Sequence, residues 1–189
     1  MKHTAVAAAL ALFAAGAAQA QGVAYAIDPT HTFVTFEVRH FGTSTVRGRF
    51  DRAQGSVALD KAARTGRADI TIETASINSG IAAFDAHLKN KDFFDASVHP
   101  AARFVAERFE FDGDKVATVP GALTLLGKTL PVTLRATNFN CYDNPRIKRE
   151  VCGGDFETTI QRSQWGMTFG LPGIPDNVRL VIQIEAAKQ

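Results

Sequence analysis

The feature that most constrains the fold of this chain is a repeated alternation of apolar and polar residues. In the stretch HTFVTFEVRH, which starts at His31, the residues Val34, Phe36 and Val38 fall on one face and the residues between them fall on the other. The stretch VRLVIQIEA near the end of the chain repeats the pattern. Successive side chains of a β-strand point to opposite faces of a sheet, so the alternation predicts strands with one buried face.

Segments of this kind recur along the chain and are separated by turns rich in Gly, Asp and Pro. Further strands are predicted within residues 44–60, 68–77, 102–127, 128–139 and 155–167. About eight antiparallel strands in one domain are typical of an up-and-down barrel or a two-sheet sandwich, and an eight-stranded barrel can hold one small ligand. Because the sequence shows no internal repeat and no low-complexity linker, we expect residues 21–189 to form a single domain.

The first 20 residues have the pattern of a secretory signal peptide. Lys2 and His3 precede an uncharged apolar run from Ala5 to Ala18, and Ala18-Gln19-Ala20 is a small-x-small cleavage signal. The run is short for a membrane-spanning helix and has a typical signal-peptide flank. We expect cleavage after Ala20 and export to an oxidising compartment.

Composition narrows the classes of function. The formal net charge is only +2 at pH 7, which gives no basic surface for nucleic acid. Phenylalanine, with 14 residues, outnumbers tyrosine and tryptophan, with 2 and 1. A carbohydrate or nucleic-acid surface favours aromatic residues with a polar group, so the Phe-rich composition indicates either an ordinary core or an apolar ligand.

The two cysteines, Cys141 and Cys152, are expected to form a disulfide. Paired thiols are usual in exported proteins, and the segment between them contains the turn signal Asp143-Asn144-Pro145. We therefore expect a hairpin closed at its base by the disulfide. A redox-active pair is the alternative, but the C-x-x-C spacing is absent.

Residues 79–94 interrupt the strand pattern. Ile81, Phe84 and Leu88 have the spacing of one helix face, and Asp85 with Lys89 forms an i, i+4 pair on the other side. A helix of about three turns does not stand alone in water and must dock its apolar face. We expect it to cover one open end of a barrel.

The polar residues of this segment give little support for catalysis. Asp85 and His87 are two positions apart and point to different sides of a helix, and no G-x-S-x-G motif is present. His87 is expected to be a partly exposed residue near a helix C-terminus, with an acid–base role as the less favoured alternative.

The histidines also lack the spacing of metal ligands, so no metal site is expected. His40 extends the apolar face of Val34, Phe36 and Val38. It is interpreted either as a head-group contact at the rim of the lumen or as a satisfied core histidine.

Seven sequence pieces, in order across residues 25–186, resemble the YceI-like family of periplasmic, lipocalin-like, polyisoprenoid-binding proteins. The pieces are DPTHTFVTFEVRHFG, VRGRFDRAQGSVALD, ITIETASINSG, DAHLKNKDFFDASVHPAARF, VPGALTLLGKTLPVTL, IQRSQWGM and DNVRLVIQIEA. The central helix block and the G-x-LT-x-x-G-x-x-x-PV run are the most specific.

The resemblance implies an all-β fold, an extended eight-stranded antiparallel barrel with a short helix near one end. It implies an apolar lumen that binds an isoprenoid chain, an isoprenoid quinone or a fatty-acid-like lipid, with no required cofactor and no established enzymatic activity. It further implies a periplasmic protein, often a homodimer, with a membrane cytochrome b as a possible partner. Two departures stand out: Phe84 replaces the family's usual Arg, and the Cys141–Cys152 excursion is not general to the family.

The expected ligand contacts are apolar residues of the lumen together with polar residues at its mouth. The full set is Val34, Phe36, Val38, His40, Phe50, Ile70, Ile72, Phe84, His87, Leu88, Phe93, Phe94, Leu123, Leu125, Arg162, Trp165 and Met167. Lys89 and Lys91 are further head-group candidates. A register shift of one residue would turn such a set to the other face of the sheet. The alternatives are an enzyme acting on a lipid or quinone and a structural module with a solid barrel.

Overall fold

The computed structural model describes residues 22–189, and the predicted signal peptide lies outside this range. The strands are β1 (Val23–Ile27), β2 (Phe33–His40), β3 (Ser44–Phe50), β4 (Ala53–Asp60), β5 (Thr65–Glu73), β6 (Ile77–Asn78), β7 (Ala101–Ala106), β8 (Glu110–Asp112), β9 (Lys115–Leu125), β10 (Lys128–Asn144), β11 (Arg149–Gln161) and β12 (Asn177–Lys188). The helical elements are α1 (Ala82–Leu88) and the 3₁₀ turns η1 (Thr74–Ser76) and η2 (Arg162–Trp165).

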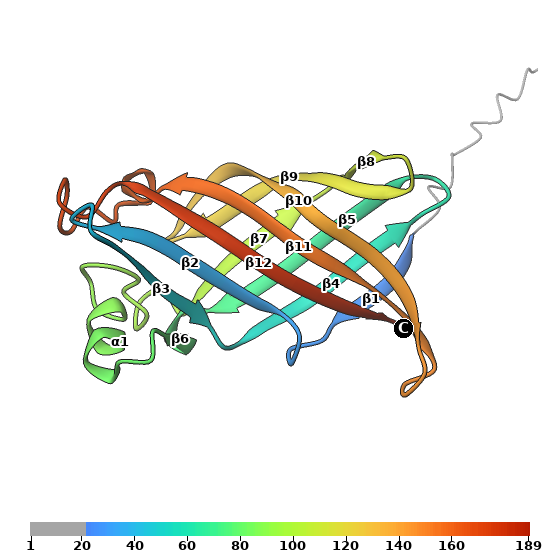
Figure 1. Ribbon diagram of the computed structural model, residues 1–189, viewed down its shortest axis with the longest axis horizontal. Helices are drawn as coiled ribbons and strands as arrows, with labels where there is room; N and C mark the ends of the chain where they lie inside the picture. Colours follow the sequence, from blue (N-terminus) through green and yellow to red (C-terminus); the bar gives the residue numbers. More distant parts are fainter. Residues whose placement is uncertain (1–21) are drawn as a thin grey trace, which may run out of the picture.

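Eight of the strands close an antiparallel barrel. They follow the order β1-β4-β5-β7-β9-β10-β11-β12, and β12 pairs with β1 to complete the ring. Strands β2, β3 and β6 lengthen the wall at one end, because β2 pairs with the first half of β12 and β3 pairs with β2. The elongated barrel in Figure 1 therefore confirms the eight-stranded architecture and rules out the two-sheet sandwich.

The wall is divided into more strands than the alternation predicts, because two long stretches bend. Residues 28–32 separate β1 from β2, and residues 51–52 separate β3 from β4. At the first bend the Asp28 carboxylate accepts hydrogen bonds from the Thr30 backbone N–H and hydroxyl, which holds a tight turn. Each bend divides one long stretch of wall into two strands.

The predicted helix is present but shorter than the 79–94 pattern. Asp85 accepts hydrogen bonds from the backbone N–H and hydroxyl of Ser79, at 2.7 and 2.5 Å. Ile81 precedes the helix in an extended conformation and is 61% exposed, so its predicted place on the docked face is wrong. Leu88 is buried and Phe84 packs against the core. Helix α1 and the β2–β3 turn lie at the same end of the barrel (Figure 1).

The hairpin β10–β11 contains the predicted disulfide. Cys141 and Cys152 face each other across the two strands and are joined at 2.06 Å. At the tip, the Asn144 side chain accepts hydrogen bonds from the backbone N–H groups of Arg146 and Ile147. The turn signal in the sequence therefore acts through the side chain of Asn144.

Candidate functional site

The barrel lumen contains two adjoining cavities. The larger, about 550 Å³, lies at the α1 end, and the smaller, about 130 Å³, lies toward the other end. Four side chains line both cavities: Val34, Ile72, Leu123 and Leu180. The two cavities therefore adjoin one another along the barrel, and these four side chains form the junction between them.

The larger cavity contains most of the predicted ligand contacts. Its wall includes Val34, Phe36, Val38, His40, Phe50, Ile72, Phe84, His87, Leu88, Phe93, Phe94, Leu123, Leu125, Arg162 and Met167. Strands β2 and β12 supply one side because Phe36 lies opposite Leu180 in the ladder. Helix α1 and the residues after it cover the end, as the amphipathic spacing of Phe84 and Leu88 predicts.

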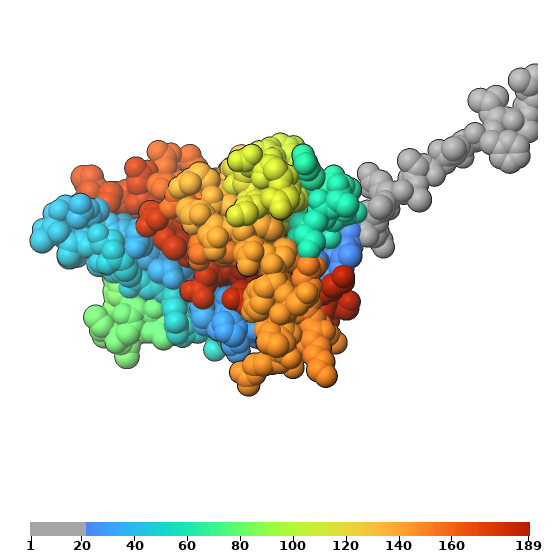
Figure 2. Space-filling view, turned by 45° about the vertical axis from the view of Figure 1, so that its right-hand side comes forward, coloured from blue at the N-terminus to red at the C-terminus, as the bar shows by residue number. Residues whose placement is uncertain are grey.

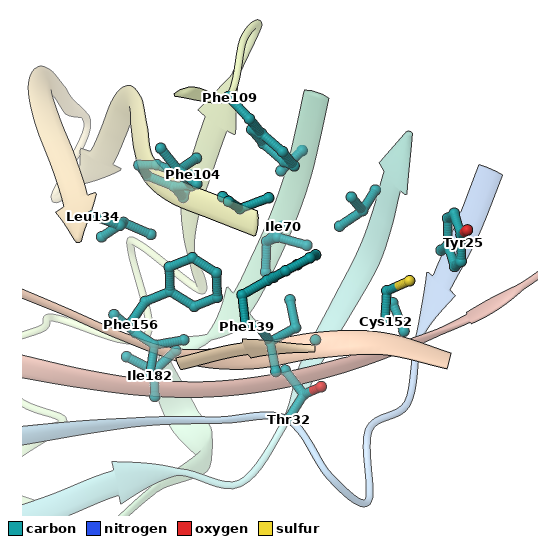
Figure 3. A pocket seen from close by; sticks show the side chains of 18 of the residues that line it. Tyr25, Thr32, Ile70, Phe104, Phe109, Leu134, Phe139, Cys152, Phe156 and Ile182 are labelled. Carbon is teal, nitrogen blue, oxygen red and sulfur yellow. The ribbon is translucent and has the colours of Figure 1, made fainter. Parts of the chain in front are cut away.

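The smaller cavity is lined by residues from both halves of the chain, and Ile70 is the predicted contact that it adds. Figure 3 shows the side chains of Phe104, Phe139 and Phe156 converging on this part of the lumen from three different strands. The hydroxyl of Thr32 donates to the backbone oxygen of Glu185, which leaves an apolar surface toward the cavity. This end of the lumen suits a hydrocarbon chain.

Two glycines make room for aromatic rings in the wall. A Cβ atom at Gly48 would lie 2.5 Å from the Phe36 ring, and one at Gly121 would lie 2.5 Å from the Phe104 ring. Any other residue at these positions would push a ring out of its place. The width of the lumen therefore depends on glycine as well as on the apolar side chains that face it.

Arg162 is the buried charge of the larger cavity. Its guanidinium donates to the backbone oxygens of Pro175, Met167 and Ile174, at 3.1, 3.0 and 2.9 Å. Burial lowers the pKa of the guanidinium, and the nearby Asp176 carboxylate partly offsets this effect. Arg162 therefore both holds the loop of residues 166–176 and places a positive charge beside the cavity.

Three polar candidates do not line the lumen, which corrects the predicted set. Trp165 is buried, but it lines neither cavity, and its indole N–H donates to the backbone oxygen of Leu123 at 3.3 Å. Lys89 and Lys91 also lie outside both linings. Trp165 lies in the 3₁₀ turn η2, and its side chain is part of the hydrophobic core instead of the lumen wall.

The two histidines of the predicted set lie at the mouth of the larger cavity. His87 contacts the rings of Phe93 and Phe169 edge-on, with centroids 5.0 and 5.1 Å apart, and its Nε2 lies 3.5 Å from the Asp92 carboxylate. His40 is exposed and contacts the ring of Phe41 at 4.8 Å. Both imidazoles can therefore meet a polar group that enters the mouth.

The far end of the lumen contains a polar cluster whose side chains bind one another. The hydroxyl of Tyr25 donates to the Glu150 carboxylate at 2.5 Å, and Lys61 forms an ion pair with the same carboxylate. Burial, followed by the hydrogen bond to Glu150, raises the pKa of Tyr25 well above its usual value. The phenol therefore stays neutral and acts as a structural donor.

The candidate acid–base pair and the potential metal ligands have other partners in the structure. Asp85 is bound to Ser79, whereas His87 lies beside Asp92. Within residues 22–189, the one group of three potential metal ligands is Cys141, Glu150 and Cys152, and its two thiols are joined in the disulfide. A disulfide sulfur lacks the thiolate charge that metal binding needs.

Sequence reasoning missed part of the lumen. The missed residues in the walls include Tyr25, Phe104, Phe139 and Phe156, and those in loops at the mouth include Phe41, Phe169 and Ile174. Phe156 could have been found, because it alternates with Thr158 and Ile160 in a predicted strand. The loop residues follow no period, so the pattern holds no signal for them.

The sequence of this chain is similar to that of a known family and its members. The family model described as YceI-like domain matches residues 25–186. A UPF0312 protein of Pseudomonas aeruginosa strain PAO1 is 34% identical over 194 residues, covering 100% of both chains. A UPF0312 protein of Pseudomonas putida strain KT2440 is 33% identical over 192 residues, covering 100% of this chain and 99% of the relative.

Solved structures share the architecture. The YCEI protein of Campylobacter jejuni superimposes with a TM-score of 0.72 at 25% identity, over 80% of this chain and 90% of that chain. A polyisoprenoid binding domain from Saccharophagus degradans superimposes with a TM-score of 0.64 at 15% identity, over 88% of this chain and 99% of that chain. At 15% identity the second likeness concerns the fold alone. Within residues 22–189, no helix has the length and apolar character needed to cross a membrane.

Proposed function

Because the chain belongs to the YceI-like family, we propose that it is a binding protein that holds a long-chain lipid in the lumen of its barrel. The ligand classes that fit are a polyisoprenoid, an isoprenoid quinone and a fatty-acid-like lipid. The observation that carries the proposal is the pair of adjoining apolar cavities in the lumen. The fold that the chain shares with a polyisoprenoid binding domain supports the same choice.

The lumen is suited to a hydrocarbon chain. Moving apolar surface out of water contributes about 25 cal/mol per Å², without any need for directional contacts. The larger cavity, at about 550 Å³, falls in the usual range for small-molecule pockets. The smaller cavity adjoins it, and we propose that a chain that enters at the α1 end extends past the junction.

The polar end of the ligand is placed at the mouth. His40, His87 and Arg162 are the side chains of the larger cavity that can donate hydrogen bonds to a head group. The resemblance to the family implies that Phe84 replaces a usual arginine, and on that basis this chain offers one cation fewer at the mouth. We therefore expect head-group recognition to be looser than recognition of the tail.

Two alternatives receive less support. A solid barrel would leave few voids larger than a water molecule, whereas this lumen contains a cavity of about 550 Å³. For an enzyme, the acid–base role considered for Asp85 with His87 lacks support, because Asp85 contacts Ser79 and His87 contacts Asp92.

The cellular setting is also part of the proposal. The signal-peptide pattern of residues 1–20 supports export and a mature domain of residues 21–189, and the disulfide fits an oxidising compartment such as the periplasm. The homodimer and the cytochrome b partner stay predictions.

The test is to identify the compound that purifies with the protein. The native protein is denatured, extracted with organic solvent and analysed by mass spectrometry, beside an unrelated protein prepared from the same cells. We expect a compound with a long hydrocarbon chain that is absent from the control extract. Repeated native preparations without any such compound, and with no uptake of added lipid, would sink the proposal.

A further inference from the structure

Two loops form the tip of the barrel at the mouth of the larger cavity. One, residues 41–43, is the β2–β3 turn, and the other, residues 166–176, connects η2 to β12; they are called the apical loops below. The backbone N–H of Phe41 donates to the oxygen of Gly173 at 3.1 Å, which joins the two loops. They lie together at the left-hand end of Figures 1 and 2.

The apical loops expose apolar side chains and have a single charged residue, Asp176, next to β12. The Asp176 carboxylate accepts hydrogen bonds from the backbone N–H and hydroxyl of Ser163, and residues 41–43 and 166–175 contain no Asp, Glu, Lys, Arg or His. Phe41 is 66% exposed, Phe169 44% and Leu171 37%. Single exposed apolar residues are normal, but three on one uncharged tip indicate an interaction surface.

The same loops face the lumen on their inner side. Phe41, Phe169 and Ile174 line the larger cavity, and Phe169 also contacts the rings of His87 and Phe93. The apolar surface therefore continues from the cavity to the outside of the molecule. A hydrocarbon chain that leaves the lumen here would otherwise pass through water.

We propose that the apical loops insert into the surface of a lipid bilayer and that the ligand passes between barrel and membrane through this mouth. The inference rests on the proposed function, because it gives the lumen a lipid to exchange. Side chains of Phe and Leu that enter the boundary between head groups and acyl chains contribute apolar burial without needing charge. A zwitterionic bilayer is therefore sufficient as the partner.

A second copy of the chain fits this surface less well. A stable protein interface buries about 800 Å² on each partner, and a projecting tip with three exposed apolar side chains supplies little flat area. A bilayer adapts its shape to a projecting loop, so it can surround all three side chains at once.

The test measures flotation of the purified full-length mature protein with phosphatidylcholine vesicles. Phe41→Asn and Leu171→Asn remove one apolar side chain each, and Asn tolerates the positive φ of 48° at position 41. Ile147→Asn is the matched control, because Ile147 is 48% exposed at the β10–β11 turn, at the opposite end of the barrel. We expect each apical variant to lower vesicle partitioning about tenfold or more. The control and a rise in salt concentration should leave it unchanged.

Three other flotation results would each overturn the inference. They are failure of the wild-type protein to float, equal flotation of all variants, and loss of flotation in high salt. Size-exclusion chromatography adds another: a wild-type dimer that Phe41→Asn separates into monomers would make the apical loops an interface between copies. If the native protein yields a long-chain lipid on extraction but does not float with vesicles, only the membrane docking is refuted. The proposed function then stands.

Discussion

At the scale of single residues, Arg162 both stabilises a loop at the mouth of the lumen and supplies a buried positive charge there. A buried guanidinium needs its donors satisfied, and here three backbone oxygens of the 166–176 loop accept from it. Asp176, which is held by the backbone N–H and hydroxyl of Ser163, supplies a nearby negative charge. The Arg162 side chain therefore makes three of the hydrogen bonds that position the loop that carries Phe169.

We expect Arg162→Leu to lower the free energy of unfolding by about 3 kcal/mol, because it leaves three backbone oxygens without a charged donor. Urea unfolding followed by circular dichroism measures the change. The loop should also become more susceptible to proteolysis within residues 166–176.

The matched control is Arg103→Leu. Arg103 forms a two-pronged ion pair with Asp69 on the surface, where its side chain is 55% exposed. Exposed pairs contribute about 1 kcal/mol or less, so this variant should change stability little. Equal losses in both variants would show that Arg162 has no special role in holding the loop.

Residue identities were predictable where a regular strand carries them. Val34, Phe36 and Val38 fall on the lumen face because β2 keeps the period of two over its whole length. Trp165 lies in the 3₁₀ turn η2, and Phe41 and Phe169 lie in loops, so no strand period locates these three residues. Their positions depend on contacts between segments far apart in the sequence.

At the scale of elements, the β10–β11 hairpin combines two constraints on the same strands. The ladder pairs Cys141 directly with Cys152, and the disulfide then closes a loop with a sequence separation of 11. The ladder fixes the register in the folded state, whereas the disulfide chiefly restricts the unfolded chain.

Replacing both cysteines, as Cys141→Ala with Cys152→Ala, should lower the free energy of unfolding by about 3 kcal/mol while the barrel still forms. Urea unfolding of the variant and of the wild-type protein, each with and without a reducing agent, measures this. Reduction should shift only the wild-type curve, down to that of the variant. A variant as stable as the oxidised wild type would show that the disulfide adds nothing to the hairpin.

Helix α1 shows what a sequence pattern leaves open. The apolar spacing located the element and the inward faces of Phe84 and Leu88. Its start was wrong, because Ser79 bonds to the Asp85 side chain and keeps residues 79–81 out of the helix. The sequence pattern fits a helix that begins at residue 79 as well as one that begins at residue 82. The choice between the two starts depends on a local side-chain hydrogen bond.

At the scale of the whole molecule, the lumen is a property of how the strands pair. The alternation predicted which residues face inward, but cavity volume depends on which residues meet across the barrel. Gly48 lies opposite Phe36 in the ladder and gives that ring its space. The alternation within each strand does not give the register of such a pairing, so the architecture was predictable and the division into two cavities was not.

The junction between the cavities gives a test of the passage as a unit. Val34 lines both cavities, so Val34→Trp should fill the junction and confine a ligand to the larger cavity. We expect binding of long-chain lipids to weaken about tenfold or more, with short-chain lipids less affected, because only the tail loses its apolar environment. A lipid-binding titration over a series of chain lengths measures this.

Val98→Trp, at a position 65% exposed outside both linings, is the control. If the Val34 variant binds every chain length as the wild-type protein does, the tail does not pass the junction and the smaller cavity is not part of the binding site.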